Sequence, residues 1–215
     1  MLELYMHPLA SYCWKVLLAL YETDTPFTPH VIDLADPAQR AELTALWPFA
    51  RFPVLRDHAR GEVVPESSII IEYLARHYPS AAHLVPDDLD VRARDRFFDL
   101  YVQDPLGRIV RDMLNPGDPA VVAAAKQMLV TAYGVVDSFP ERDDFTLADC
   151  AAAPALFYAD QLVPITQPRT RAYLERLLAR PSMIRVRREA EPYWHNFPGA
   201  RKPESSSQGA KQHRS

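Results

Sequence analysis

The sequence predicts an α/β domain followed by an all-helical domain. Strand and helix patterns alternate up to residue 79, whereas every periodic segment after residue 87 has helical spacing. The stretch between them, PSAAHLVPDDLD, has the composition of a loop and separates the two parts. We therefore expect domains at residues 1–79 and 87–197, and a disordered tail at residues 198–215, where apolar side chains are scarce.

The first domain is expected to follow the order β, α, β, α, β, β, α. Residues 2–5 alternate apolar and polar side chains, which predicts a short strand. A helix follows, because four apolar residues recur at helical spacing and leave Lys15 and Glu22 outside their stripe: Cys13, Val16, Leu17 and Leu20. The remaining strands are expected at residues 30–32, 52–55 and 62–64, and the remaining helices at residues 38–46 and 67–78.

The second domain is expected to consist of helices joined by loops. They are predicted at residues 90–113, 119–139, 147–162, 170–179 and 181–189. The helix at 147–162 has a distinct start signal, because Thr146 stands at the cap position and Asp149 follows three residues later. Phe145 before the cap completes a capping-box arrangement with an apolar staple. We assign this motif to folding.

Composition argues against several classes of protein. The chain has 215 residues, 48% hydrophobic and 24% charged, so it can bury a substantial core. A net charge of −4 favours neither nucleic acid nor a membrane surface as a partner. Cys13 and Cys150 lie far apart and outside any CxxC pair, so we expect neither disulfides nor a metal site. With no signal-peptide pattern at the amino terminus, these features favour the cytoplasm.

The segment Glu66-Ser67-Ser68 stands at the start of a predicted helix, where several backbone N–H groups lack a partner within the helix. Such a helix start can bind a carboxylate, because its N–H groups and the positive end of the helix dipole face the anion. The alternative is that Ser67 or Ser68 acts only as a helix cap.

Pro53 stands at the entry to a predicted strand, where proline is tolerated because it need not donate a hydrogen bond. If the Phe52–Pro53 bond is cis, the N–H and C=O of Phe52 are turned outward. An extended peptide can then pair with them as an added strand.

Ser11 lies in a strand-to-helix turn, where its hydroxyl can donate a hydrogen bond to a thiolate near the positive end of the helix. Lowering a thiol pKa by one unit takes about 1.4 kcal/mol, which one charged hydrogen bond and the helix dipole can supply. Cys13 belongs to the apolar stripe, so we expect it to be a small buried residue.

Taken together, these segments resemble the cytosolic glutathione transferase family over residues 1 to about 195, with bacterial members of the serine type as the nearest group. HPLASYCWKVLLALYE resembles the first strand-to-helix turn of that family, and ARFPVL resembles its cis-proline segment. PESSIIIEYL is similar to its glutamate-serine helix start, and FTLADCAAAPAL to the capping box of its helical domain. Each motif is weak alone, but their order and spacing are distinctive.

The resemblance implies a thioredoxin-like first domain that binds glutathione as co-substrate. Glu66 and Ser67 would hold the γ-glutamyl end, and the main chain of Phe52 before Pro53 would pair with the cysteinyl part. Arg51 would reach the glycyl carboxylate. For the catalytic residue we choose Ser11. Many serine-type members carry the active hydroxyl at the position that Ala10 occupies in this chain. Tyr12 and Cys13 therefore stay open as alternatives.

The resemblance further implies a glutathione transferase that joins the glutathione thiolate to a small hydrophobic electrophile, as detoxifying enzymes do. It also implies a cytoplasmic homodimer that pairs through the helix at residues 90–113, without a metal. Two alternatives stay open. One is a glutathione-dependent isomerase or lyase, and the other is a non-catalytic ligand-binding or scaffold protein that has lost thiol activation.

Overall fold

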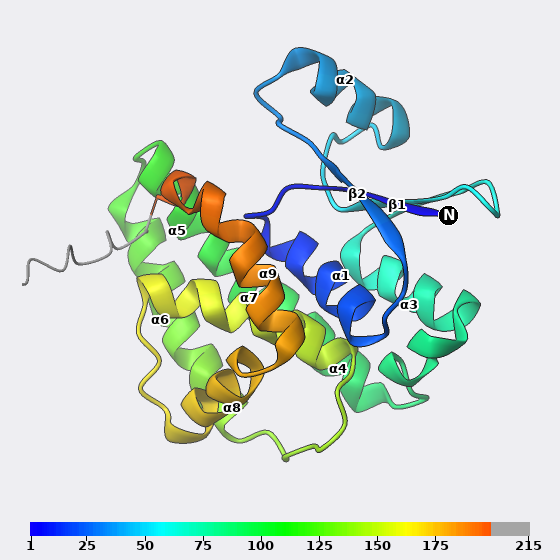
Figure 1. Ribbon diagram of the computed structural model, residues 1–215. Coiled ribbons are helices and arrows are strands. Elements are labelled where there is room, and N and C mark those ends of the chain that lie inside the picture. The colour runs from blue at the N-terminus through cyan, green and yellow to red at the C-terminus, as the bar shows by residue number, and fades with distance from the viewer. Residues whose placement is uncertain (199–215) are drawn as a thin grey trace, which may run out of the picture.

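The computed structural model describes residues 1–198 and shows a small mixed sheet beside a bundle of helices (Figure 1). The tail expected at residues 198–215 lies, beyond Pro198, outside the described residues. The sheet strands are β1 Leu2–Met6, β2 Phe27–Val31, β3 Val54–Asp57 and β4 Glu62–Pro65. The helices among them are α1 Ser11–Glu22, α2 Pro37–Leu46 and α3 Ser67–His77, followed by the short 3-10 helix η1 Pro79–Leu84.

The second part of the described chain is helical throughout, which confirms the predicted fold class. Its elements are α4 Leu89–Phe97, the π-helical segment η2 Phe98–Gln103, α5 Asp104–Leu114, α6 Pro119–Asp137, α7 Leu147–Leu162, α8 Pro168–Leu178, α9 Pro181–Ala190 and the 3-10 helix η3 Glu191–Asn196. The domain boundary between residues 79 and 87 stays a prediction, and η1 occupies most of this stretch.

The sheet has the strand order β2-β1-β3-β4. β1 runs parallel to β2 and antiparallel to β3, and β3 runs antiparallel to β4. The sequence places β2 at residues 30–32, but the strand begins earlier, at Phe27, and includes Pro29. Proline fits here because β2 is an edge strand, so its missing N–H leaves no neighbouring strand without a donor.

Alternation along the strands divides the core between the two faces of the sheet. Leu4 and Leu55 face α1 and α3 in the larger core, whereas Tyr5 and Val54 face α2 in a smaller one. Figure 1 shows α2 standing apart from the helical bundle, on the far side of the sheet. The face that carries α1 is therefore the one that joins the two parts of the molecule.

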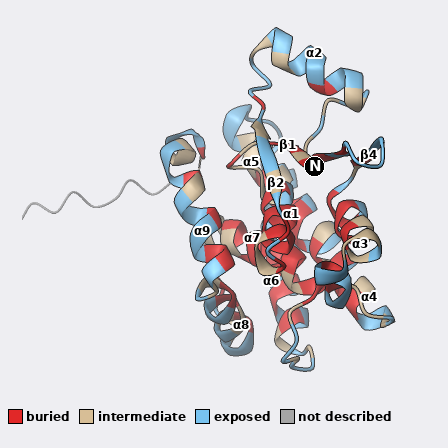
Figure 2. Cartoon of the chain, turned by 45° about the vertical axis from the view of Figure 1, so that its right-hand side comes forward, coloured by how far each residue is buried: buried red, intermediate tan, exposed pale blue. Residues whose placement is uncertain are grey.

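Helix α1 lies in the middle of the molecule, where Figure 2 shows the buried residues concentrated. It packs against α3 on one side and against α7 and α9 on the other. Trp14, which is fully buried, stacks on Phe157 and packs against Tyr158 of α7, and its indole N–H donates to the Pro8 carbonyl. A helix with apolar residues on nearly all sides must be covered on all sides, which explains this central position.

Helix α6 is long and apolar enough to cross a membrane by length and composition alone, with 28% of its apolar window buried. A core helix of a soluble protein can pass the same test, so this finding is weak evidence. Within the described residues α6 packs against α5 and α8, as a member of the helical bundle.

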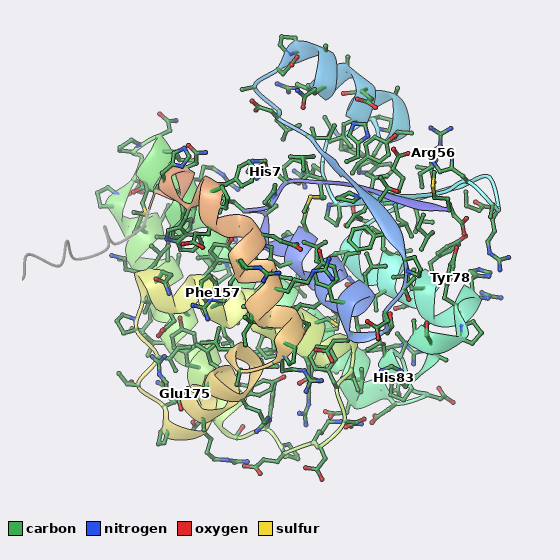
Figure 3. All side chains as sticks on the ribbon, in the orientation of Figure 1. His7, Arg56, Tyr78, His83, Phe157 and Glu175 are labelled. Carbon is green, nitrogen blue, oxygen red and sulfur yellow. The ribbon has the colours of Figure 1, made fainter. Side chains whose placement is uncertain are left out.

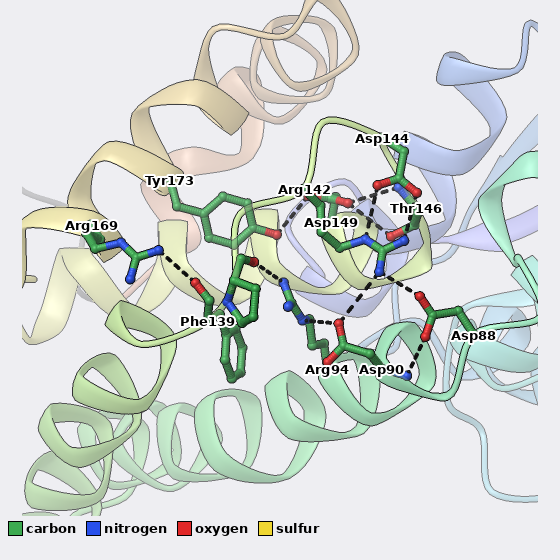
Figure 4. A network of polar contacts seen from close by, with 11 residues as sticks. Asp88, Asp90, Arg94, Phe139, Arg142, Asp144, Thr146, Asp149, Arg169 and Tyr173 are labelled. Carbon is green, nitrogen blue, oxygen red and sulfur yellow. Dashed lines mark hydrogen bonds and ion pairs between the residues drawn. The ribbon is translucent and has the colours of Figure 1, made fainter.

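The polar network in Figure 4 stabilises the connection between α6 and α7. Arg142 donates to Asp88 and Asp144, and Arg94 donates to the carbonyl of Pro140. At the start of α7 the backbone N–H of Thr146 donates to Asp149, and the capping box predicted from the sequence is present. This network lies at the base of the bundle and holds the connection in place.

Candidate functional site

A cleft of about 410 Å³ lies where the start of α3 faces the middle of the α4–α5 helix. All five residues predicted to bind glutathione line it, namely Arg51, Phe52, Pro53, Glu66 and Ser67. They come from two segments of the first part of the chain, and Arg96, Asp99, Leu100 and Asp104 close the cleft from the second part. Folding thus brings the predicted residues to one place.

The peptide bond between Phe52 and Pro53 is cis. No hydrogen bond joins the main chain of Phe52 to another described residue, so its N–H and C=O are free to bind a ligand. The side chain of Phe52 stacks on His7, with ring centroids 6.0 Å apart. Arg51, next to it, is exposed and forms no ion pair with a described residue.

The start of α3 has an unusual backbone. Glu66, at the cap position, has φ 69° and ψ 118°, outside the regions that residues with a side chain prefer. Such conformations cluster at ligand-binding sites, where the surrounding structure maintains them. The Glu66 side chain is exposed, and the buried Ser67 hydroxyl makes no hydrogen bond to a described residue. The helix start therefore offers free donors to an anion in the cleft.

Ser11, the predicted catalytic residue, lies beside this cleft and not in its lining. It begins α1, and its hydroxyl donates to Oε1 of Gln103 at 3.0 Å. It lines a second, more apolar pocket of about 230 Å³, formed by Leu9, Ala10, Ser11, Tyr12, Gln103, Leu106, Gly107, Val110, Tyr158 and Phe197. Tyr12 lines both pockets, so Ser11 stands at their junction.

Of the two alternatives to Ser11, the structure disfavours Cys13. Its side chain is fully buried, and burial raises the pKa of the Cys13 thiol to about 12. Tyr12 is partly exposed, and burial of its hydroxyl end also raises its pKa. A tyrosine with a raised pKa stays protonated and can donate a hydrogen bond to a sulfur. Tyr12 therefore remains an alternative, whereas Cys13 is a core residue.

Beneath the cleft lies a buried ionic cluster that the sequence reasoning missed. The Lys15 ammonium is 2.5 Å from Asp95 and 3.0 Å from Asp99, and it donates to the Ser68 hydroxyl at 2.8 Å. Lys15 is only 1% exposed, although its helical position predicted a place outside the apolar stripe. The composition of α1 could have predicted this burial. A lone lysine in a helix that is apolar on nearly all sides is expected to be buried beside a charged partner.

His7 connects the cleft to the end of the chain. Its ring stacks on Phe52 and packs edge-on against Tyr193 of η3, and the centroids of the His7 and Tyr193 rings are 5.4 Å apart. Burial lowers the pKa of His7, and the charge of Asp33 opposes this shift. His7 is therefore a packing residue at the edge of the site, where burial disfavours the charged form of its ring.

No group of three or more His, Cys, Asp or Glu side chains within residues 1–198 is placed to hold a metal ion. What the two pockets can do follows from their linings. The larger one offers main-chain groups, an arginine and a helix start, which suit a small extended peptide with carboxylates. The smaller one offers apolar walls beside Ser11, which suit a hydrophobic compound.

Comparison with known proteins agrees with this geometry. The family model for the amino-terminal domain of glutathione S-transferases matches residues 4–82. A glutathione S-transferase from Methylobacillus flagellatus, solved with glutathione bound, superposes with a TM-score of 0.74 at 23% identity. The match covers 86% of this chain and 98% of that one. Residues 4–82 thus match the amino-terminal domain of glutathione S-transferases, and the chain as a whole shares the fold of a protein of that family.

Proteins similar to this chain differ in what they are named for. A stringent starvation protein A homolog from Coxiella burnetii is 29% identical over 174 residues, which are 78% of this chain and 80% of the relative. A probable maleylacetoacetate isomerase from Caenorhabditis elegans is 28% identical over 171 residues, covering 74% and 78%. These similarities therefore leave the activity to be argued from the site.

Proposed function

We propose that this protein is a glutathione transferase that binds glutathione in the larger cleft and joins its sulfur to a small hydrophobic electrophile in the adjoining pocket. One observation carries the proposal: two segments distant in sequence, around Pro53 and Glu66, meet in one cleft with free main-chain and helix-start donors. The adjoining pocket with Ser11 at its edge supplies a place for the second substrate.

The cleft suits glutathione group by group. The start of α3 would bind the γ-glutamyl carboxylate through backbone N–H groups and Ser67, while Glu66 would face the ammonium group. The main chain of Phe52 would pair with the cysteinyl residue as a short added strand. Arg51 would reach the glycyl carboxylate, because it is exposed at the rim and has no competing ion pair among the described residues.

The reaction then needs only an activated sulfur and proximity. The thiol proton leaves to solvent, and the thiolate forms a bond to an electrophilic carbon. The carbon releases a leaving group with its bonding electrons or, at an activated double bond, the adjacent carbon takes up a proton. The Ser11 hydroxyl and the start of α1 would stabilise the thiolate.

Calorimetry tests the binding step. We expect wild-type protein to bind glutathione and Glu66→Ala to bind it at least about tenfold more weakly, because a charged hydrogen bond is lost. Glu62→Ala is the matched control, since Glu62 is an exposed glutamate on β4 outside the cleft. Wild-type protein that gives no heat with millimolar glutathione would refute the proposal.

Enzyme kinetics tests the catalytic residue. We expect Ser11→Ala to lower conjugation to a model aryl halide about tenfold or more, since one charged hydrogen bond is lost. Tyr12→Phe, made in parallel, is expected to keep most of the activity. The reverse ranking would assign thiol activation to Tyr12 instead.

Two other functions have specific support. The likeness to a probable maleylacetoacetate isomerase favours a glutathione-dependent isomerase, in which the thiolate adds to the substrate and is released again. Ala10, beside Ser11 in the lining of the smaller pocket, favours a non-catalytic protein, and one similar protein is named a stringent starvation protein A homolog and not for an enzyme activity. Product analysis separates the three, because only a transferase accumulates a stable conjugate and only an inactive protein leaves both substrates unchanged.

We also propose that the protein is a homodimer of the cytoplasm. Four large apolar side chains are exposed on α3, on η2 and on the loop after α2: Phe49, Ile69, Leu100 and Tyr101. Phe49 is 71% exposed, and Ile69 and Leu100 line the cleft. A second copy covering them would remove this apolar surface from water. Sedimentation should show a dimer that Phe49→Ser weakens, whereas Ile184→Ser, on exposed α9, should leave it intact.

A further inference from the structure

Ser11 and Gln103 form an isolated polar pair at the edge of the second pocket. The Ser11 hydroxyl donates to Oε1 of Gln103 at 3.0 Å, across 92 residues of sequence. Gln103 is 6% exposed, so few water molecules can replace Ser11 as its partner. Because the Ser11 hydroxyl has a single proton and donates it to Gln103, that proton points away from any ligand in the pocket.

The other half of the Gln103 amide is free. No described residue accepts a hydrogen bond from its Nε2 group, yet the side chain lines the pocket. An amide presents oxygen and nitrogen on a nearly symmetric frame, so half a turn about its last bond exchanges acceptor and donor at the same place. For Gln103 this turn breaks only the bond to Ser11 and at once replaces it by one of opposite direction.

We propose that Gln103 is a positioning residue that sets the direction of the Ser11 hydrogen bond, and this rests on the proposed binding of glutathione. Without ligand, Ser11 donates to Gln103. With glutathione bound, the amide turns, Nε2 donates to the Ser11 oxygen, and the hydroxyl proton points to the sulfur. Ser11 thus acts as a donor to the thiolate while its own oxygen is held by the amide.

The backbone explains how Gln103 reaches this place. It is the last residue of the π-helical segment η2, and Pro105 just beyond lacks the N–H that would bond to the Tyr101 carbonyl in a regular helix. Asp99, four residues earlier, binds Lys15, which stands four residues after Ser11 on α1. Two polar contacts one helical turn apart therefore fix the register of α1 against η2 and bring Gln103 to Ser11.

The test measures the thiol of bound glutathione by the ultraviolet absorbance of its thiolate as a function of pH. Gln103→Met keeps the length of the side chain but removes both amide groups. We expect it to raise the pKa of the bound thiol by about half to one unit, which is about three- to tenfold less thiolate below that pKa. The affinity for S-methylglutathione, which has no thiol, should stay within about twofold, because Gln103 does not touch the tripeptide.

Controls separate this role from general damage to the site. With Gln127→Met, on the exposed face of α6, the bound thiol should titrate as in wild type. Gln103→Leu should raise the thiol pKa as Gln103→Met does, which shows that the effect does not come from a distortion specific to methionine. In a Ser11→Ala background Gln103→Met should add nothing, because there is no hydroxyl to orient. An unchanged thiol pKa, or an equal rise in the Ser11→Ala background, would overturn the inference. If wild-type protein fails to bind glutathione at all, the proposed function fails instead.

Discussion

At the scale of single residues, Lys15 is buried, so its charge must be stabilised by neighbouring side chains and not by water. Its ammonium is surrounded by Asp95, Asp99 and the Ser68 hydroxyl, all within hydrogen-bond reach and all largely buried. Burial raises the pKa of Asp99, and the charge of Lys15 opposes this shift. The cluster also adjoins the larger cleft, because Ser68 and Asp99 line it. Its integrity should therefore matter for both stability and binding.

Replacing Lys15 tests this dependence. Lys15→Met keeps the volume but leaves two buried carboxylates without a counter-charge, so we expect a loss of about 3–5 kcal/mol in the free energy of unfolding. Lys126→Met, on the exposed face of α6, should change it by less than about 0.5 kcal/mol. Urea titration followed by circular dichroism measures both. Equal stability of the two variants would show that the cluster contributes little.

At the scale of secondary-structure elements, two helices have an aspartate at or near their start, and the two aspartates differ in the hydrogen bonds that they accept. Asp36 caps exposed α2 and accepts from the N–H of Ala38 at 2.8 Å. Asp149 lies in the first turn of central α7, and it accepts from the N–H of Thr146 at 2.9 Å and from the hydroxyl of Tyr173 at 2.8 Å. The second aspartate thus joins a helix start to the neighbouring helix α8, as Figure 4 shows.

Alanine at each position should separate capping from this added link. Asp36→Ala is expected to lower the free energy of unfolding only slightly, because the hydrogen bond that this cap accepts from Ala38 is exposed to solvent. Asp149→Ala should cost about 2–3 kcal/mol, because it also leaves the hydroxyl of the half-buried Tyr173 without its acceptor. Thermal and urea unfolding of the two variants, compared with wild type, measures the difference. A smaller loss for Asp149→Ala than for Asp36→Ala would contradict this account.

At the scale of the whole molecule, α1 holds the two parts together. Tyr158 of α7 donates to the Leu9 carbonyl at 2.8 Å, just before α1 begins. At the other end of α1, Glu22 accepts from Arg180 and Ser182 at the start of α9. Burial by itself raises the pKa of Glu22, but the hydrogen bonds from Arg180 and Ser182 outweigh it and hold the pKa below its usual value.

The sign of this shift gives a pH dependence. The unfolded chain takes up a proton at Glu22 at higher pH than the folded chain does, so protons favour unfolding. The stabilisation is complete above the ordinary glutamate pKa and is lost as the pH falls through the folded value. We therefore expect Glu22→Gln to be less stable than wild type at neutral pH, with a difference that shrinks below about pH 4.

Urea titrations across this pH range measure the effect. Glu175→Gln is the matched control, because Glu175 is exposed on α8 and forms no ion pair with a described residue (Figure 3). It should follow the wild-type curve at every pH. A Glu22→Gln curve that stays parallel to wild type down to low pH would show that this carboxylate does not couple the two parts through its charge.

The sequence alone determined the local structure. The alternation of apolar and polar side chains predicted β1, which is present. The three-residue spacing of Thr146 and Asp149 predicted a capping box, which is also present. The segments around Pro53 and Glu66 line one cleft, and their role in binding glutathione stays a prediction. The strand and the helix cap could be predicted because each depends on residues only a few positions away.

Only the tertiary structure decided the polar contacts of α1. Lys15 was expected outside the apolar stripe, yet it is buried against Asp99, 84 residues away, and Ser11 meets Gln103, 92 residues away. Such pairs depend on how α1 packs against a π-helical segment, and helical periodicity says which side of a helix is apolar but not what will cover the other side. The local pattern fixes each helix, whereas the packing between helices decides which of their polar side chains meet.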